Sequence, residues 1–318
     1  MGGRARDFLR SIKGTLLFFV LICWLLPALL LGAYMGGRFF TSLREKTESA
    51  LIAGARHAQG LLLQNLAHVI SLAKDVTYDG EVSEAVTSYA AGRLRNEDYR
   101  KIVRNYIDRK YSRERLCDYA IFFRLEEPSQ ILYTSQGYFF AMDFVRDAQR
   151  DVIGLCETLD TRCRFYAEGD RVYLVRNLYN TRMERYGILV LGLNAQALTR
   201  PVTDAAADNR AAFALSIDDY HLGTFLPQTR AGELEEYGDA LCYTQTVSDY
   251  DYALRFQVQA DRRAVYREMD NFRALLTFLL WLLVPVCAGI MVYVQKRIVR
   301  PIGLLSDASR RIEAGELG

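Results

Sequence analysis

LLFFVLICWLLPALLLGAY (Leu16–Tyr34) is the first of two apolar runs that decide how this chain is organised, and LLTFLLWLLVPVCAGIMVYV (Leu275–Val294) is the second. Neither run contains a charged residue. Each is close to the ~20 residues that a helix needs to cross the ~30 Å hydrocarbon core of a bilayer. We therefore predict two transmembrane helices, at residues 15–37 and 273–295, in contact with the lipid bilayer.

A cleaved signal peptide is the alternative for the first run. Its apolar segment is longer than the roughly 7–15 residues of a signal peptide, and Gly32-Ala33-Tyr34-Met35 does not resemble a small-x-small cleavage site. The sequence therefore favours an uncleaved membrane anchor.

Basic residues flank the outer ends of both runs. Positive charge collects on the cytoplasmic side of membrane helices. We therefore predict a cell-membrane protein with a cytoplasmic N-terminus at 1–14, an extracytoplasmic segment at 38–272 and a cytoplasmic segment at 296–318. The basic residues are Arg4, Arg6, Arg10 and Lys13 before the first run, and Lys296, Arg297, Arg300, Arg310 and Arg311 after the second.

Charge and motifs exclude several classes of function. The net charge of the 318 residues is +2, which does not favour a nucleic-acid partner. The sequence has none of the patterns GxxxxGK[ST], HExxH, GxSxG or GxGxxG, so we expect neither catalysis nor a cofactor in the chain as given. Only three histidines are present and none lies near a CxxC pair, so we expect no metal site.

Two cysteines of the extracytoplasmic segment are close in sequence. Cys156 and Cys163 are separated by a short stretch that a loop could close, and disulfides persist outside the cytoplasm. A disulfide between them is the favoured prediction, and two free thiols are the alternative.

The extracytoplasmic segment begins with a predicted long helix at 41–76. Apolar residues at spacings of three and four form a seam along it, interrupted by one asparagine. The seam could pack against a partner chain or against the domain's own sheet. Its members are Leu51, Ala55, Ala58, Leu62, Asn65, Val69, Leu72 and Val76.

Short β-branched and aromatic runs then alternate with helical stretches, which predicts an α+β fold with antiparallel sheets. A larger, membrane-distal module is expected at 77–198 and a smaller, membrane-proximal one at 199–262. The predicted helices are Asn96–Tyr111, Asp143–Cys156 and Asn194–Arg210, the last broken at Arg200-Pro201. The predicted strands are 118–124, 130–135, 171–178 and 186–193 in the distal module, and 212–217, 240–247 and 252–259 in the proximal one.

Aromatic and charged residues gather after the second predicted strand. Small-molecule pockets combine aromatic walls with a few charged groups. We therefore predict a ligand site with Tyr133, Gln136, Tyr138, Phe139, Phe140 and Asp143, together with Arg124 and Arg176 on neighbouring strands. The alternative is that Arg176 pairs with an internal carboxylate and the aromatic residues form the core.

The segment after the second apolar run resembles the first half of a HAMP linker, a dimeric relay element of membrane receptors. Arg300-Pro301-Ile302 matches the start of its first helix, and Gly315-Glu316-Leu317 matches the turn that ends it. Ile302, Leu305, Ser309 and Ile312 lie on one face of the helix between them. The resemblance implies a homodimer.

The layout of two membrane runs, a long helix and two unequal sheet modules resembles a double Cache sensor. NEDY (Asn96–Tyr99) and YGILVLGLN (Tyr186–Asn194) are similar to segments of YesM-like sensor histidine kinases. This implies the sensory part of a two-component histidine kinase, which binds a small molecule or a ligand-loaded binding protein. The chain to Gly318 lacks the kinase domain, so a chemoreceptor, a diguanylate cyclase front end and a stand-alone binding protein remain alternatives.

Overall fold

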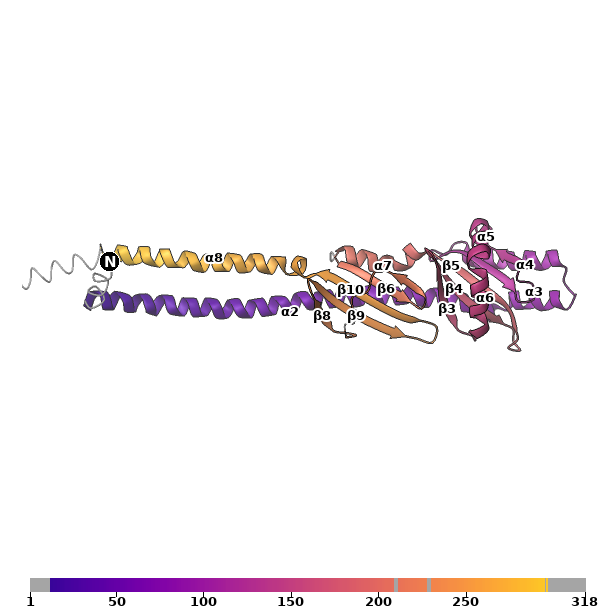
Figure 1. Ribbon diagram of the computed structural model, residues 1–318, viewed down its shortest axis with the longest axis horizontal. Coiled ribbons are helices and arrows are strands. Elements are labelled where there is room, and N and C mark those ends of the chain that lie inside the picture. The colour runs from indigo at the N-terminus through magenta and orange to yellow at the C-terminus, as the bar shows by residue number, and fades with distance from the viewer. Residues whose placement is uncertain (1–11, 209–210, 228–229, 295, 297–318) are drawn as a thin grey trace, which may run out of the picture. The chain divides into compact units, whose positions relative to one another are not determined.

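The computed structural model of the protein describes residues 12–208, 211–227, 230–294 and 296 (Figure 1). The chain divides into two units, one formed by Met1–Thr47 with Val265–Gly318 and the other by Glu48–Ala264. The predicted relay residues lie outside the described residues: Arg300, Pro301, Ile302, Leu305, Ile312, Gly315 and Glu316.

Two helices enter the first unit. Helix α2 spans Ile12–Asp79 and helix α8 spans Arg262–Val294. Within this unit they contact each other, because the rings of Phe39 and Phe272 lie 4.9 Å apart. Among the residues that the structure describes, one helical stretch, Arg262–Ile290, contains an apolar segment long enough to cross a membrane. The two-span topology stays a prediction.

The second unit contains a first module built on a five-stranded antiparallel sheet. Its strand order is β2-β1-β5-β4-β3, and the strands are β1 (Cys117–Arg124), β2 (Ile131–Tyr133), β3 (Cys163–Glu168), β4 (Arg171–Tyr179) and β5 (Arg185–Leu193). Its helices are α3 (Glu81–Ala90), α4 (Asn96–Tyr111), α5 (Tyr138–Asp147) and α6 (Gln149–Thr158).

A second module repeats this architecture. Its strand order, β7-β6-β10-β9-β8, is the same order in terms of its own strands. The strands are β6 (Ala211–Ile217), β7 (Tyr220–Leu222), β8 (Leu234–Tyr237), β9 (Ala240–Ser248) and β10 (Ala253–Asp261), preceded by helix α7 (Ala195–Asp208). Both sheets have five strands, so the predicted strand numbers, four in the first sheet and three in the second, were too low. The prediction of an α+β fold with antiparallel sheets is confirmed.

Helix α7 continues through Pro201 instead of breaking there. Proline removes one backbone donor from a helix interior, which favours a break. Here Leu198 and Val202 are fully buried on either side of the proline, and this packing holds the helix together.

The seam of α2 packs against the chain's own modules. Its apolar members are buried, and the Asn65 side-chain amide donates a hydrogen bond to the Leu198 carbonyl of α7 over 3.2 Å. Farther along, the Tyr111 hydroxyl of α4 donates to the Leu72 carbonyl over 3.0 Å. Of the two open possibilities, the structure therefore shows packing on the same chain for residues 48–79.

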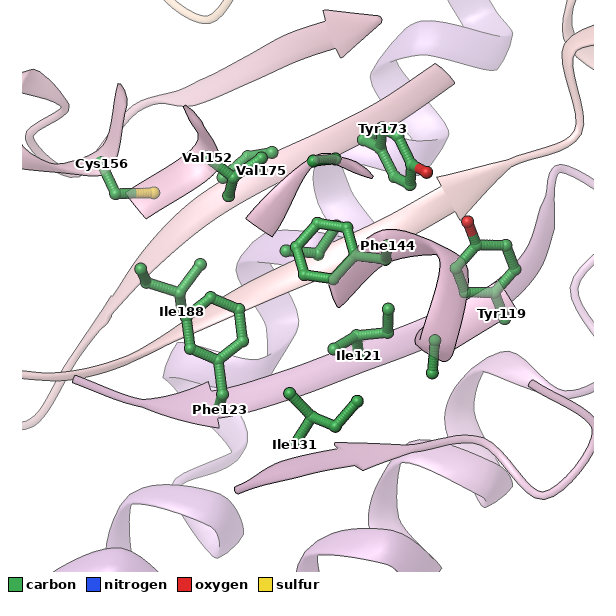
Figure 2. Packing of buried hydrophobic residues seen from close by; sticks show 13 residues of the cluster. Tyr119, Ile121, Phe123, Ile131, Phe144, Val152, Cys156, Tyr173, Val175 and Ile188 are labelled. Carbon is green, nitrogen blue, oxygen red and sulfur yellow. The ribbon is translucent and has the colours of Figure 1, made fainter. Parts of the chain in front are cut away.

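Helices α5 and α6 cover one face of the first sheet with an apolar cluster (Figure 2). The strand residues that point into it follow the period of two that a pleated strand imposes. They are Tyr119, Ile121 and Phe123 of β1, Tyr173 and Val175 of β4, and Ile188 and Val190 of β5, packed against Phe144, Val152 and Cys156 of the helices. The intervening residues of each strand point to the opposite face.

This alternation explains why the predicted disulfide is absent. Cys156 and Cys163 are both free and buried. Cys156 lies in the apolar cluster beside Val175. Cys163 is the cross-strand partner of Arg176, so its side chain lies on the other face of the sheet. The prediction of a bond between them was wrong, because the sheet separates the two thiols.

Candidate functional site

A pocket of about 270 Å³ opens where β1 and β4 begin and β5 ends. These strand ends meet because the strands are antiparallel neighbours, with Gly192 paired to Tyr119 on one side and to Tyr173 on the other. Helix α5 and the first turn of α7 complete the walls. The polar and aromatic lining residues are Asp118, Tyr119, Phe140, Asp170, Arg171, Asn194 and Gln196.

An aromatic pair forms one wall of the pocket. The rings of Tyr119 and Phe140 are stacked, with centroids 4.8 Å apart and an interplanar angle of 6°. Tyr119 can lie flat across β5 because residue 192 is glycine: a Cβ atom there would be 2.3 Å from Tyr119 Cζ. Burial, and then hydrogen bonding to Tyr173, raise the pKa of Tyr119, so its hydroxyl stays neutral.

A guanidinium group lies beside this wall. Arg171 has its guanidinium carbon 5.9 Å from the centroid of the Phe140 ring, and its Nη2 donates to Asp143 Oδ2 over 2.5 Å. This hydrogen bond holds the pKa of Asp143 below its usual value and raises the pKa of Arg171. Arg146 also contacts Asp143, with its Nη2 3.0 Å from Oδ1. Asp143 therefore has a second cation, and Arg171 is not its sole partner.

The opposite side of the pocket carries acceptors and a helix start. The Asn194 side chain donates to Asp118 Oδ1 over 2.9 Å and accepts from the Ala197 backbone N–H over 2.9 Å, which caps helix α7. Gln196 lies in the first turn of that helix, where the helix dipole favours a negative group. The carboxylates of Asp118 and Asp170 favour a positive group. The pocket thus offers complementary charges to both ends of a small polar molecule.

The predicted ligand residues are only partly brought together. Phe140 lines the pocket and Asp143 contacts it through Arg171. Tyr133 and Tyr138 form an aromatic pair with centroids 6.0 Å apart, outside the lining. Gln136 is exposed, and so are Tyr138 and Phe139.

Arg124 and Arg176 lie on the other face of the sheet. Arg124 forms ion pairs with Glu126 and Glu127 and has its guanidinium carbon 5.0 Å from the Tyr89 ring centroid of α3. Arg176 is 5% exposed, and its Nη1 donates to Cys163 Sγ over 3.6 Å. Among the residues that the structure describes, no carboxylate forms an ion pair with Arg176, and its Nε has no hydrogen-bond partner. The carboxylate proposed by the alternative interpretation is therefore not found in that part of the chain.

The sequence analysis missed most of the pocket lining, namely Arg171, Tyr119, Asp118, Asp170, Asn194 and Gln196. Arg171 begins β4, two and four residues before Tyr173 and Val175, and shares their face. The period of two groups Arg171 with Tyr173 and Val175, but the sequence does not show that this face of β4, and not the face of Arg176, meets Phe140.

Neither a family model nor a curated protein sequence matches the chain. Several solved sensor domains are similar to it in structure. The periplasmic sensory domain of the Campylobacter jejuni chemoreceptor Tlp1 matches with 12% identity and a TM-score of 0.43, over 70% of this chain and 98% of that chain. The Vibrio cholerae LuxQ periplasmic domain matches with 11% identity and a TM-score of 0.41, over 66% and 97%. An extracellular ligand binding receptor from Desulfohalobium retbaense DSM5692 matches with 10% identity and a TM-score of 0.41, over 63% of this chain but 39% of that chain.

Proposed function

We propose that the protein is a membrane-bound receptor whose first extracytoplasmic module binds a small polar ligand in the pocket around Arg171. The observation that carries this proposal is the pocket's lining: a stacked aromatic wall, a guanidinium, two carboxylates and the start of a helix converge on about 270 Å³. Pockets for small ligands combine such walls with a few polar groups. A molecule with a positive and a negative end matches this lining best.

The direct connection from the second module to helix α8 supports a receptor rather than a free binding protein. Strand β10 ends at Asp261 and α8 begins at the next residue, Arg262, so the second module leads directly into the apolar helix. In this proposal α8 crosses the membrane, and the HAMP-like segment at 296–318 passes the change to a cytoplasmic output in a homodimer. The output we propose is a two-component histidine kinase. A chemoreceptor or a cyclic-dinucleotide enzyme would use the same front end.

Thermal unfolding of the full chain in detergent tests the binding role. A panel of small zwitterionic and polar compounds is screened for a shift in melting temperature, because a ligand at 100 times its Kd stabilises by about 2.7 kcal/mol. Arg171→Ala should abolish the shift of any compound that stabilises the wild type. Arg146→Ala is the matched control, because Arg146 also pairs with Asp143 but does not line the pocket. An equal shift in both variants would place the ligand elsewhere.

The membrane topology is tested separately with fusions. A reporter that is active only in the cytoplasm should work when fused after Gly318 and fail when inserted at Asp219. The reverse pattern would exclude an extracytoplasmic sensor.

A further inference from the structure

Strand β3 is an edge strand of the first sheet, and it faces the second module. It pairs with β4 on one side, and in the described part of the chain no strand pairs with its other side. An edge strand leaves alternate backbone N–H groups without sheet partners, and such groups need acceptors when they are buried. Cys163 and Phe165 present these N–H groups, and both residues are buried.

Two carboxylates of the second module accept these hydrogen bonds. Asp251 Oδ1 accepts from the Cys163 N–H over 2.9 Å, and Asp218 Oδ2 accepts from the Phe165 N–H over 3.0 Å. Asp218 lies in the turn between β6 and β7, and Asp251 lies in the turn between β9 and β10. Two separate turns of one module therefore hold two successive free N–H groups of the other. Hydrogen bonds to an ionised acceptor are stronger than those between neutral groups.

The second oxygen of each carboxylate is also bound. Asp218 Oδ1 accepts from the Ala253 N–H at the start of β10 over 2.9 Å. Asp251 Oδ2 is 2.5 Å from the Lys74 ammonium of α2. Asp251 thus joins three parts of the chain, namely β3, α2 and the β9–β10 turn. Its side chain is 7% exposed, so little water competes for these contacts.

The two carboxylates connect strand β3, whose far end is paired to the candidate site, with strand β10, which precedes α8 in the chain. At the far end of β3, Glu168 is the cross-strand partner of Arg171, which lines the pocket. Strand β10 begins at Ala253, whose N–H donates to Asp218, and its last residue directly precedes α8. A shift of the β3–β4 hairpin would therefore displace Asp218 and Asp251, and through them the start of β10.

We propose that Asp218 and Asp251 are coupling residues, which hold the free edge of β3 by hydrogen bonds and transmit changes at Arg171 to β10. Their role in signalling rests on the proposed receptor function. The coupling between β3 and β10 does not depend on that function, and it can be measured without any ligand.

The test follows backbone hydrogen exchange of the full chain in detergent, with Arg171→Ala as the perturbation in place of a ligand. In the otherwise wild-type protein, Arg171→Ala should change the exchange rates of the β10 amides at 254–261 by about fivefold or more, the lower end of ordinary coupling between sites. In an Asp218→Asn, Asp251→Asn background the same substitution should change them less than about twofold. A carboxamide keeps the size but replaces one of the two acceptor oxygens by a donor. Equal transmission in both backgrounds would overturn the proposal.

Asp249→Asn is the matched control. Asp249 lies in the same turn as Asp251, and its side chain accepts from the Tyr250 N–H within that turn. Transmission should stay intact in this variant. A loss as large as that of the coupling variants would show that any change in the turn suffices, and would also overturn the proposal.

Native cysteines show whether the variants remain folded. Cys242 is buried in β9 of the second module, and Cys156 is buried in the first. The double substitution of Asp218 and Asp251 should raise the labelling rate of Cys242 by about tenfold, which is the effect of losing one charge-assisted hydrogen bond. The labelling rate of Cys156 should stay unchanged. If the double variant exposes both thiols, the single variants Asp218→Asn and Asp251→Asn are compared instead. Each single variant removes part of the hydrogen bonding to β3 and should reduce the effect of Arg171→Ala on the β10 amides. An undiminished effect in both would refute coupling through these residues.

Discussion

Gly192→Ala tests the packing on which the candidate site depends. The new Cβ would lie 2.3 Å from Tyr119 Cζ and 2.4 and 2.7 Å from its two Cε atoms. Ordinary contacts between carbon atoms are about 3.5–4.0 Å, so the ring must move by roughly 1 Å. Tyr119 is buried, stacks on Phe140 and belongs to the apolar cluster, so moving its ring disturbs both.

We expect this substitution to lower the free energy of unfolding by about 2 kcal/mol, because an added methyl group in a packed core costs roughly 1–3 kcal/mol. Urea unfolding of a fragment of residues 48–264, followed by circular dichroism, would measure it. The midpoint should fall while the slope with urea stays constant, since the surface exposed on unfolding is nearly unchanged. The variant should also lose ligand-induced stabilisation, because the Tyr119–Phe140 wall is displaced.

Gly154→Ala is the matched control. Gly154 is an exposed residue of α6, and a Cβ there would meet no atom within 4 Å. Alanine is better than glycine in a helix interior, so this variant should gain about 0.5–1 kcal/mol. If Gly192→Ala were as stable as Gly154→Ala, the Tyr119 ring would not lie across residue 192, and the described wall of the pocket would be wrong.

Two further predictions concern acid stability and dimerisation. The Tyr106 hydroxyl donates to Asp79 over 2.5 Å and is the main cause that lowers the pKa of Asp79 from its usual 3.8. A lowered folded-state pKa stabilises the fold above about pH 4, and this contribution is lost as the pH falls through the lowered value. Tyr106→Phe should therefore cost about 1 kcal/mol at pH 7, allowing for the exposure of Asp79, and progressively less as the pH falls below about 4 in urea titrations; a loss that does not change with pH would contradict this. If the 296–318 segment forms a dimeric HAMP helix, a cysteine at Leu305 should crosslink between subunits at higher yield than one at Arg310, whereas equal yields would indicate a simple membrane flank.

The elements with strong local patterns could be predicted from the sequence. The predicted bounds Asn96–Tyr111 are those of α4, and the strands predicted at 118–124, 171–178 and 186–193 coincide closely with β1, β4 and β5. These strands are almost entirely buried and rich in β-branched and aromatic residues, so their composition is distinctive.

The missed strands all lie at sheet edges. β3 and β8 each end one sheet order, and β7 begins the order of the second sheet. β7 has three residues and β8 has four, and no residue of β8 is fully buried. Edge strands need only one covered face and one paired side, so their sequences tolerate polar residues and lose the alternating pattern. This is why only three of the five strands of the second sheet were predicted.

The same geometry explains why the candidate site could be predicted only in part. The sequence separates β4 into two alternating sets, one with Tyr173 and Val175 and the other with Leu174 and Arg176. Both sets are buried, so hydrophobicity cannot tell which set faces α5 and α6. Residues that are neighbours in sequence, such as Cys156 and Cys163, can therefore lie on opposite faces. Arg171 belongs to the set with Tyr173 and Val175, and only the packing of the helices shows that this set faces Phe140.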